Sequence, residues 1–126
     1  MGLLGKVMGN AGVVPADELN NEYKNLLTEN EQIEVGFRVI RDTFIFTNLR
    51  LILVDKQGLR GKKVEYMSLK YNAISRFSIE TAGTFDLEAE LKIWLSSEDL
   101  PTISKTFNKK VNIYDLQKVL ANHVLR

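Results

Sequence analysis

The feature that most constrains this chain is the alternation of apolar and polar residues between Arg41 and Leu95. Short runs carry a β-branched or aromatic residue at every second position, and small turn segments separate the runs. A period of two sends alternate side chains to opposite faces of a sheet. The pattern therefore predicts a meander of antiparallel strands. Its polar residues suit a solvated sheet face and its turns, so the pattern alone indicates no chemistry.

The alternation predicts about seven strands in all. We expect them near Ile33–Val39, Thr43–Thr47, Arg50–Asp55, Val64–Ser68, Ala73–Glu80, Leu87–Leu95 and Ile103–Phe107. Asn48 and Leu49 form a two-residue connection, in which Asn tolerates the positive φ of a hairpin turn. In the first strand we expect Glu34, Gly36 and Arg38 to lie on the face away from the core.

Two helices flank the strands. Pro15 and Asp17 predict a helix start, and the apolar spacing that follows carries the helix for about three turns to near Thr28. Asn112 can cap a final amphipathic helix, which we expect to cover one end of a two-sheet sandwich or partly open barrel. The predicted fold is mainly β, with an N-terminal helical extension at 1–28 and one domain at 29–126.

Composition limits the function classes. The chain has 126 residues and a formal net charge of +1, from 17 basic and 16 acidic side chains that are scattered along it. Such a balance creates no broad field for a polyanion, so we expect no nucleic-acid partner. No cysteine is present, which excludes thiolate nucleophiles, disulfides and cysteine metal sites. No apolar run reaches the roughly 20 residues of a membrane span, and we expect a cytoplasmic protein without a cofactor.

Four ordered motifs carry a family resemblance: FTNLRLILVDKQG, GKKVEY, ISRFSIETAG and FDLEAELKIW. Together they resemble the bacterial pleckstrin-homology-like family over roughly 29–125, nearly the whole predicted domain. The resemblance implies two packed antiparallel sheets closed by a C-terminal helix. It also implies self-association into ring-like homo-oligomers and no established enzymatic role.

One strand carries a row of charges. Asp86, Glu88 and Glu90 are spaced two apart, project from one face and are continued by Lys92. Carboxylate chemistry or a divalent cation is one interpretation, and a solvated or interface face, which we favour, is the other. Trp94 extends the same face and is either an interface anchor or a side chain covered by the neighbouring loop.

His123 is the single histidine, with no second ligand within metal-binding spacing, and we expect a structural role. A catalytic dyad would need Ser68, Ser75, Ser78, Ser96 or Ser104, and the sequence favours none of these serines. We therefore predict no catalytic residues and no enzyme.

Lys56, Arg60, Lys62 and Lys63 form the densest basic cluster, on a glycine-containing loop. The loop either binds an anion or is a solvated hairpin tip, which we favour. Eukaryotic pleckstrin homology domains that bind inositol phosphates usually use a basic first hairpin loop. Here that connection is Arg41-Asp42, which is short and nearly neutral.

The N-terminal segment is apolar on one side, with Leu3, Leu4 and Val7 as candidate interface residues. Glycines weaken its helix, so it is either a frayed terminus or a segment that docks on its own domain or on a neighbouring subunit. Thr43–Thr47 and Ile74–Ile79 contain neither Pro nor Gly, and we expect them to be poorly protected sheet edges.

These observations favour a non-enzymatic interaction or scaffolding module that forms a ring-like homo-oligomer, with other proteins as further candidate partners. The alternative is a peripheral membrane or anionic-ligand-binding domain that uses Lys56–Lys63, for which we expect weak membrane contact at most.

Overall fold

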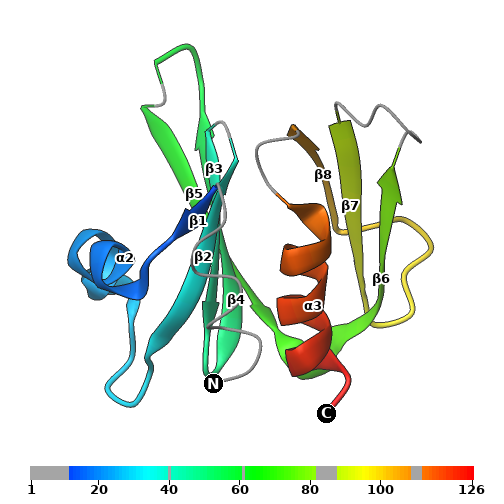
Figure 1. Cartoon of the computed structure of the whole chain (residues 1–126), viewed down its shortest axis with the longest axis horizontal. Helices are drawn as coiled ribbons and strands as arrows, with labels where there is room; N and C mark the ends of the chain where they lie inside the picture. The colour runs from blue at the N-terminus through cyan, green and yellow to red at the C-terminus, as the bar shows by residue number, and fades with distance from the viewer. Residues whose placement is uncertain (1–11, 40, 61, 82–87, 109–111) are drawn as a thin grey trace.

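A computed structural model describes residues 12–39, 41–60, 62–81, 88–108 and 112–126. Two antiparallel sheets face each other with a helix between them at the open side (Figure 1). The first sheet has the order β1-β2-β3-β4-β5 and the second has the order β6-β7-β8. The strands are β1 Val13–Val14, β2 Ile33–Val39, β3 Asp42–Thr47, β4 Arg50–Gln57, β5 Lys63–Lys70, β6 Ile74–Thr81, β7 Glu88–Leu95 and β8 Ile103–Asn108. The predicted mainly β, two-sheet fold is confirmed.

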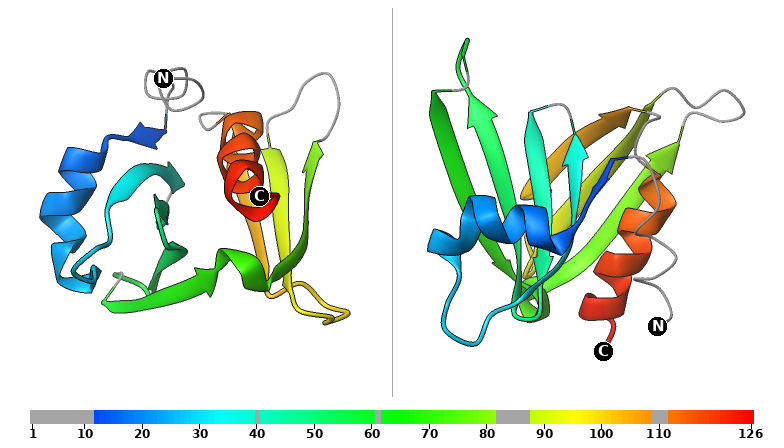
Figure 2. Two further views of the ribbon diagram at one scale, coloured as in Figure 1. Left: turned by 90° about the horizontal axis from the view of Figure 1, so that it is seen from below. Right: turned by 60° about the vertical axis from the view of Figure 1, so that its left-hand side comes forward.

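The last helix, α3, spans Ile113–Val124. The predicted cap is confirmed, because the Asn112 side chain accepts hydrogen bonds from the backbone N–H groups of Tyr114 and Asp115. The buried face of the helix lies against the core between the two sheets (Figure 2). That face consists of Ile113, Leu116, Val119, Leu120 and His123.

The first helix, α2, covers Ala16–Tyr23 and continues as a 3₁₀ turn, η1, over Lys24–Leu26, slightly short of the predicted end. It lies on the outer face of the first sheet, which is the face turned away from the second sheet (Figure 2). Leu19 is fully buried there and packs on Gly36, where an added Cβ would come within 2.2 Å of the Leu19 side chain. The expectation that Gly36 faces away from a core is therefore wrong.

The first sheet consequently has an apolar core on each face. The larger core lies between the sheets and includes Phe37, Phe44 and Phe107. A smaller core under α2 consists of Val14, Leu19, Tyr23, Ile33, Ile45, Ile52 and Val54. Side chains on both faces of β3 are buried, which explains why its sequence, DTFIFT, is apolar at consecutive positions.

Two further expectations are corrected. Ser96 is the only non-glycine residue with positive φ in the described ranges, so Asn48 does not adopt it. The Thr47 hydroxyl instead forms the β3–β4 turn by accepting hydrogen bonds from the N–H groups of Leu49 and Arg50, at 3.1 and 3.0 Å. β3 is also not an edge strand, because it pairs with β2 and with β4.

Candidate functional site

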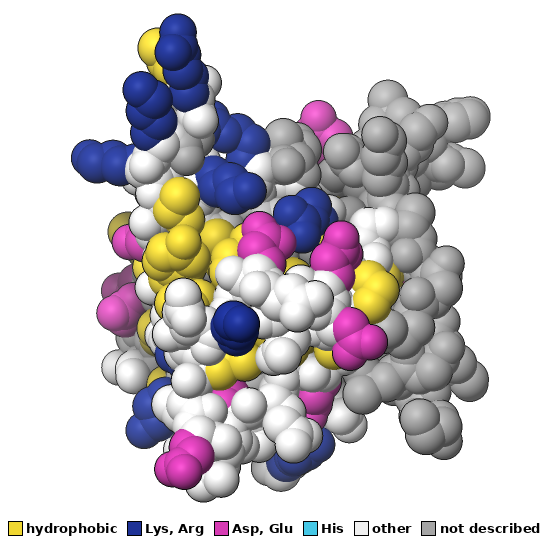
Figure 3. Space-filling view, turned by 90° about the vertical axis from the view of Figure 1, so that its left-hand side faces the viewer, with side chains coloured by type: hydrophobic (Ala, Val, Ile, Leu, Met, Phe, Trp, Pro, Cys, Tyr) yellow, Lys and Arg dark blue, Asp and Glu magenta, His cyan; other side chains and the backbone are white. Residues whose placement is uncertain are grey.

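The basic cluster lies on a hairpin that projects beyond the body of the molecule (Figure 1). Lys56 is on β4, Lys63 begins β5, and Arg60 and Lys62 lie between the two strands. In Figure 3 the basic side chains gather at this end around a hydrophobic tip. Leu59 stands at the turn and is fully exposed, at 104% of its reference area.

Arg41, which sequence reasoning treated only as part of a short connection, supports this hairpin. Its guanidinium donates a hydrogen bond to the carbonyl oxygen of Gly58. Gly58 has a φ of +82°, a backbone conformation that suits glycine and tightens the turn. A shallow hollow of about 380 Å³ is lined by Leu59, Arg60 and Lys62. The hairpin therefore presents cations around an apolar tip, without an enclosed ligand pocket in this part of the structure.

At the base of the hairpin, Lys105 links the two sheets. Its ammonium lies 3.2 Å from Asp42 Oδ2 on β3 and 3.2 Å from Asp55 Oδ2 on β4, while Lys105 itself is on β8. Burial and the neighbouring Asp55 raise the pKa of Asp42. Burial opposes the charge of Asp55 as well, but hydrogen bonds from Asp42 and Lys105 outweigh it and lower the pKa of Asp55. The charges of this cluster therefore compensate one another within the molecule. The cluster could not be predicted from the sequence, because Lys105 is 50 residues from Asp55.

The acidic row is only partly described. Asp86 lies outside the described residues, whereas Glu88 and Glu90 lie on β7. With Glu80 they line an open hollow of about 330 Å³. Glu90 accepts a hydrogen bond from the Ser104 hydroxyl at 3.0 Å and lies 3.6 Å from the ammonium of Lys92. Within the described ranges, no group of three or more His, Asp or Glu side chains is placed to hold a metal ion.

Trp94 lies against the loop that follows β7. Its indole N–H donates a hydrogen bond to the carbonyl oxygen of Asp99 at 3.2 Å. The guanidinium of Arg76, on β6, lies 4.5 Å from the centre of the Trp94 ring, a cation–π contact. Trp94 is therefore half-buried by its own neighbours, and its role as an interface anchor stays a prediction. The other candidate interface residues, Leu3, Leu4 and Val7, lie outside the described residues.

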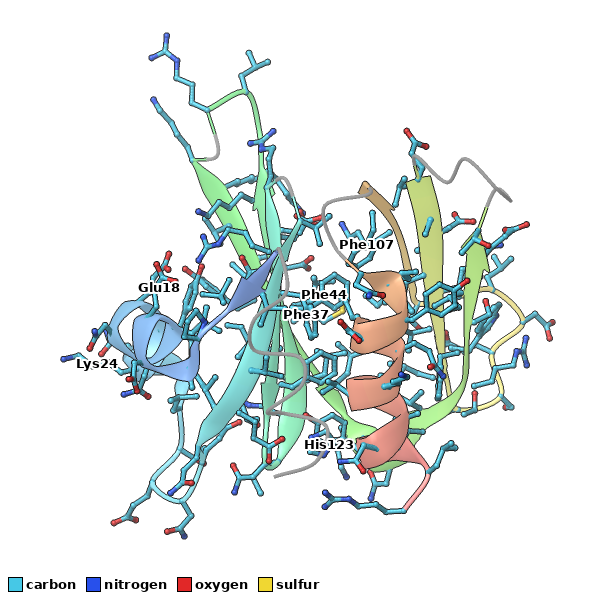
Figure 4. All side chains as sticks on the ribbon, viewed as in Figure 1. Glu18, Lys24, Phe37, Phe44, Phe107 and His123 are labelled. Carbon is cyan, nitrogen blue, oxygen red and sulfur yellow. The ribbon has the colours of Figure 1, made fainter. Side chains whose placement is uncertain are left out.

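His123 is buried on α3 and faces the first sheet (Figure 4). Its Nε2 lies 2.8 Å from Glu34 Oε1, and its ring stacks on Tyr71 with centroids 4.2 Å apart. Burial and the charge of Glu34 raise the pKa of the Tyr71 hydroxyl, which donates a hydrogen bond to the Thr47 carbonyl. Sequence spacing could not reveal this carboxylate partner, because Glu34 is 89 residues away. The histidine is thus placed as a packing and hydrogen-bonding group.

A second buried polar group, Glu31, ties the β3–β4 turn to the segment before β2. Arg50 donates hydrogen bonds to both of its carboxylate oxygens, at 2.8 and 2.9 Å, and Thr47 donates a third at 2.7 Å. Burial alone would raise the pKa of Glu31, but these bonds and one from the Thr28 N–H lower it to about 2. No local sequence pattern marks Glu31, so its role could not be predicted from the sequence.

No helix in the described ranges is long and apolar enough to cross a membrane. Two features of the described surface remain, the basic hairpin and the pair of edge strands β5 and β6, which are the longest described strands with one unpaired side. Neither feature by itself resembles a catalytic centre.

Comparison with known proteins agrees with this architecture. A family model described as bacterial PH domain matches residues 2–124. The uncharacterized protein YjqA of Bacillus subtilis (strain 168) is 51% identical over 121 residues, which cover 96% of this chain and 97% of YjqA.

Solved structures give the same relationship. The crystal structure of a pleckstrin homology domain from Shewanella amazonensis SB2B is 43% identical, with a TM-score of 0.84, and the match covers 99% of this chain and 100% of that one. A protein with a pleckstrin-homology domain from Shewanella loihica PV-4 is 50% identical, with a TM-score of 0.77 over 91% of this chain and 97% of the other. The resemblance inferred from the sequence motifs is confirmed, and the chain belongs to the bacterial PH domain family.

Proposed function

We propose that this protein is a non-enzymatic interaction module that assembles with copies of itself into a ring-like homo-oligomer. The observation that carries the proposal is the pair of long edge strands, β5 and β6. β5 and β6 have eight residues each and, within the described residues, each pairs on one side only, with β4 and β7 respectively. Neither strand contains Pro or Gly.

The outer side of an edge strand exposes a row of unpaired N–H and C=O groups that can pair with another chain. Monomeric proteins commonly block such edges with Pro, with bulges or with a covering loop. The register shift between Ile74 and Arg76 protects only the start of β6, and Arg76–Thr81 continues regularly along β7. Pairing between copies would satisfy these groups, and a repeated head-to-tail contact closes a ring where its rotation permits.

The location of the polar groups supports a role without catalysis. The only histidine is 7% exposed and bonded to Glu34, so substrate does not reach its Nε2 in this conformation. The buried carboxylate of Glu31 is fully occupied by Arg50 and Thr47, which leaves it no free oxygen for proton transfer.

Multi-angle light scattering at low micromolar concentration tests the assembly. We expect a particle of pentamer size or larger, and a 14.4 kDa monomer that persists on concentration would refute the proposal. Deleting residues 1–13 should lower the number of subunits in the particle if the N-terminal segment takes part in the assembly. An unchanged number of subunits after the deletion would show that the segment is not part of the interface.

A screen for hydrolase and transferase activity tests the absence of catalysis. It should find no turnover that depends on Glu88, Glu90 or His123.

A second candidate function is peripheral contact with an anionic membrane surface through the hairpin at Lys56–Lys63. The observation that favours it is the fully exposed Leu59 among Arg60 and Lys62. An apolar tip surrounded by cations suits a surface of anionic headgroups over acyl chains.

A further inference from the structure

The segment of residues 13–27 lies as a strap across the outer face of the first sheet. It contains β1, α2 and η1, and α2 faces the viewer in Figure 3. Within α2 only Leu19 and Tyr23 are buried. Val14 and the partly buried Leu26 pack on the same smaller core. The strap is therefore held on the sheet by few large side chains.

The helix of the strap has little support of its own. α2 has eight residues, and its N-cap residue, Pro15, makes no side-chain hydrogen bond. Isolated helices of this length are marginal in water, so α2 depends on its contact with the sheet. The Tyr23 hydroxyl is buried without a hydrogen-bond partner in the part of the chain that the structure describes, which weakens that contact.

Few hydrogen bonds hold the two ends of the strap. β1 pairs with β2 at two positions only. At the other end, the Arg50 guanidinium donates a hydrogen bond to the carbonyl oxygen of Leu26, at 2.7 Å. The strand pairs β2–β3, β3–β4 and β4–β5 do not involve the strap. The strap can therefore leave while these pairs stay intact.

The face beneath the strap is apolar in the middle and cationic at its rim. Its floor consists of side chains from the sheet and the segment that enters it: Ile33, Ile45, Ile52 and Val54. Alternation along β4 places Arg50 and Lys56 on the same face as Ile52. Lys70 on β5 lies directly opposite Arg50 and shares that face.

α2 matches this face in charge and in shape. It carries the exposed acidic residues Asp17, Glu18 and Glu22, and its sequence contains no basic residue. Glu22 Oε1 lies 3.5 Å from the guanidinium of Arg38 on β2. Leu19 fills the space over Gly36, where an added Cβ would come within 2.2 Å of it. The face thus suits an acidic helix that carries a leucine three positions before a glutamate.

We propose that the strap opens while the two-sheet body stays folded, and that the uncovered face then binds an acidic amphipathic helix of a partner protein. In this structure α2 occupies the place of that helix and blocks it. Helices that bind in grooves anchor themselves by apolar residues three or four positions apart, as Leu19 and Tyr23 are in α2. The face is the broad side of the first sheet, so this inference goes beyond the proposed assembly through β5 and β6 and does not depend on it.

Hydrogen exchange tests the opening. In the wild-type protein, the backbone amides of α2 should exchange at least about tenfold faster than those of β3 and β4, since local opening exposes them without global unfolding. Gly36→Ala should raise the exchange rate in α2 further, because the added Cβ meets the Leu19 side chain. Equal protection of α2, β3 and β4 would overturn the opening.

A peptide added in trans tests the face. The probe is a fluorescein-labelled synthetic peptide of residues 13–27, and fluorescence anisotropy measures its binding to the full-length protein. Leu19→Asp should free the face, because it places a charge in the smaller core, and should bind the peptide at least about tenfold more tightly than the wild type does. The matched control is Asn21→Asp, at an exposed position of the same helix, which should bind as weakly as the wild type.

A second variant keeps the test decisive where Leu19→Asp fails to fold, which circular dichroism shows. Asn20→Pro breaks the helix from its exposed side and leaves the core residues unchanged, so it should also gain peptide binding. A neutral peptide tests the charge of the proposed partner. Replacing Asp17, Glu18 and Glu22 of the peptide by Asn, Gln and Gln should weaken binding about threefold or more at low salt.

The outcomes decide between occupants of the face. Gain of peptide binding in Leu19→Asp or Asn20→Pro, together with weaker binding of the neutral peptide, supports the proposal. It is overturned if neither variant binds the peptide better than Asn21→Asp does, or if the neutral peptide binds as well as the acidic one. A loss of subunits in Leu19→Asp, measured by light scattering, would show that the strap of a second copy fills the face and would overturn the assignment to a partner protein.

Discussion

His123 Nε2 lies 2.8 Å from Glu34 Oε1, and this contact joins the last helix to the first strand of the main sheet. The His123 side chain is 3% exposed and that of Glu34 is 29% exposed. Tyr71 stacks on the histidine ring from the turn between the two sheets, so one side chain connects α3, β2 and η2, which spans Tyr71–Ala73. This buried position gives a structural reason for the only histidine of the chain.

We expect His123→Ala to lower the free energy of unfolding by about 2–3 kcal/mol, because it opens a cavity beside Tyr71 and removes the hydrogen bond to Glu34. His123→Phe should cost less, since it keeps the stacked ring and loses only the bond. Urea unfolding measures both, with Asn122→Ala on the exposed side of the helix as the control. A loss no larger than that of the control would contradict the structural role.

The ionised Glu31 carboxylate should contribute a part of the free energy of unfolding that is lost at acidic pH. Its pKa is about 2 in the folded protein against an ordinary value of 4.5. Because the folded value is lower, the stabilisation is present above about pH 4.5 and is lost as the pH falls towards 2. The difference corresponds to about 3 kcal/mol. Glu31→Gln should remove most of this contribution at pH 7.

Urea unfolding at several pH values between 7 and 3 checks this expectation. The wild type should lose stability more steeply than Glu31→Gln as the pH falls. Glu29→Gln, at a neighbouring exposed position, should follow the wild type. Parallel curves for the wild type and Glu31→Gln would refute the assignment.

Local patterns in the sequence predicted the strands β2 to β8 and the final helix, whereas the two-residue strand β1 at Val13–Val14 was not predicted. The period of two in β7 and the Asn112 cap depend on neighbouring residues, so they are readable without the fold. The second core was not predicted, because Ile45 and Ile52 are buried only once α2 packs on them. The partners of His123 and Lys105 were also missed, since contacts 89 and 50 residues apart leave no local pattern.

The basic hairpin shows the same limit. Its four cations were recognised from composition, but its projection from the body and the support from Arg41 require the structure. The exposed Leu59 was overlooked because a single leucine in a loop has no periodic context. What the hairpin binds depends on a partner, which no local pattern encodes.

Lys105 should contribute to the contact between the sheets. Lys105→Met leaves Asp42 and Asp55 facing each other without a cation, and we expect a loss of about 1–3 kcal/mol, less than for a fully buried pair since the groups are partly exposed. Adding Asp42→Asn should recover part of the loss by removing the repulsion. Thermal unfolding tests both, and Lys92→Met, which loses a more exposed contact with Glu90, should change stability little. A double variant less stable than Lys105→Met would contradict this electrostatic account.

The hairpin should give weak, salt-sensitive binding to anionic lipid. Each cation near such a surface contributes about 1 kcal/mol before screening, so Arg60, Lys62 and Lys63 together provide a modest attraction. Leu59→Ser should weaken binding up to about tenfold, because the leucine is the apolar group at the tip. Sedimentation with phosphatidylserine vesicles at low and physiological salt is the measurement. Replacing the three cations by Glu should abolish binding, whereas Lys24→Glu, on the opposite side of the first sheet from α3, should leave it unchanged (Figure 4).

The hairpin should not select one phosphoinositide. The short Arg41-Asp42 connection offers no basic first loop, so vesicles with a phosphoinositide should bind no better than phosphatidylserine vesicles of equal charge. Tight binding to one phosphoinositide would refute this expectation and move the function from assembly towards headgroup recognition.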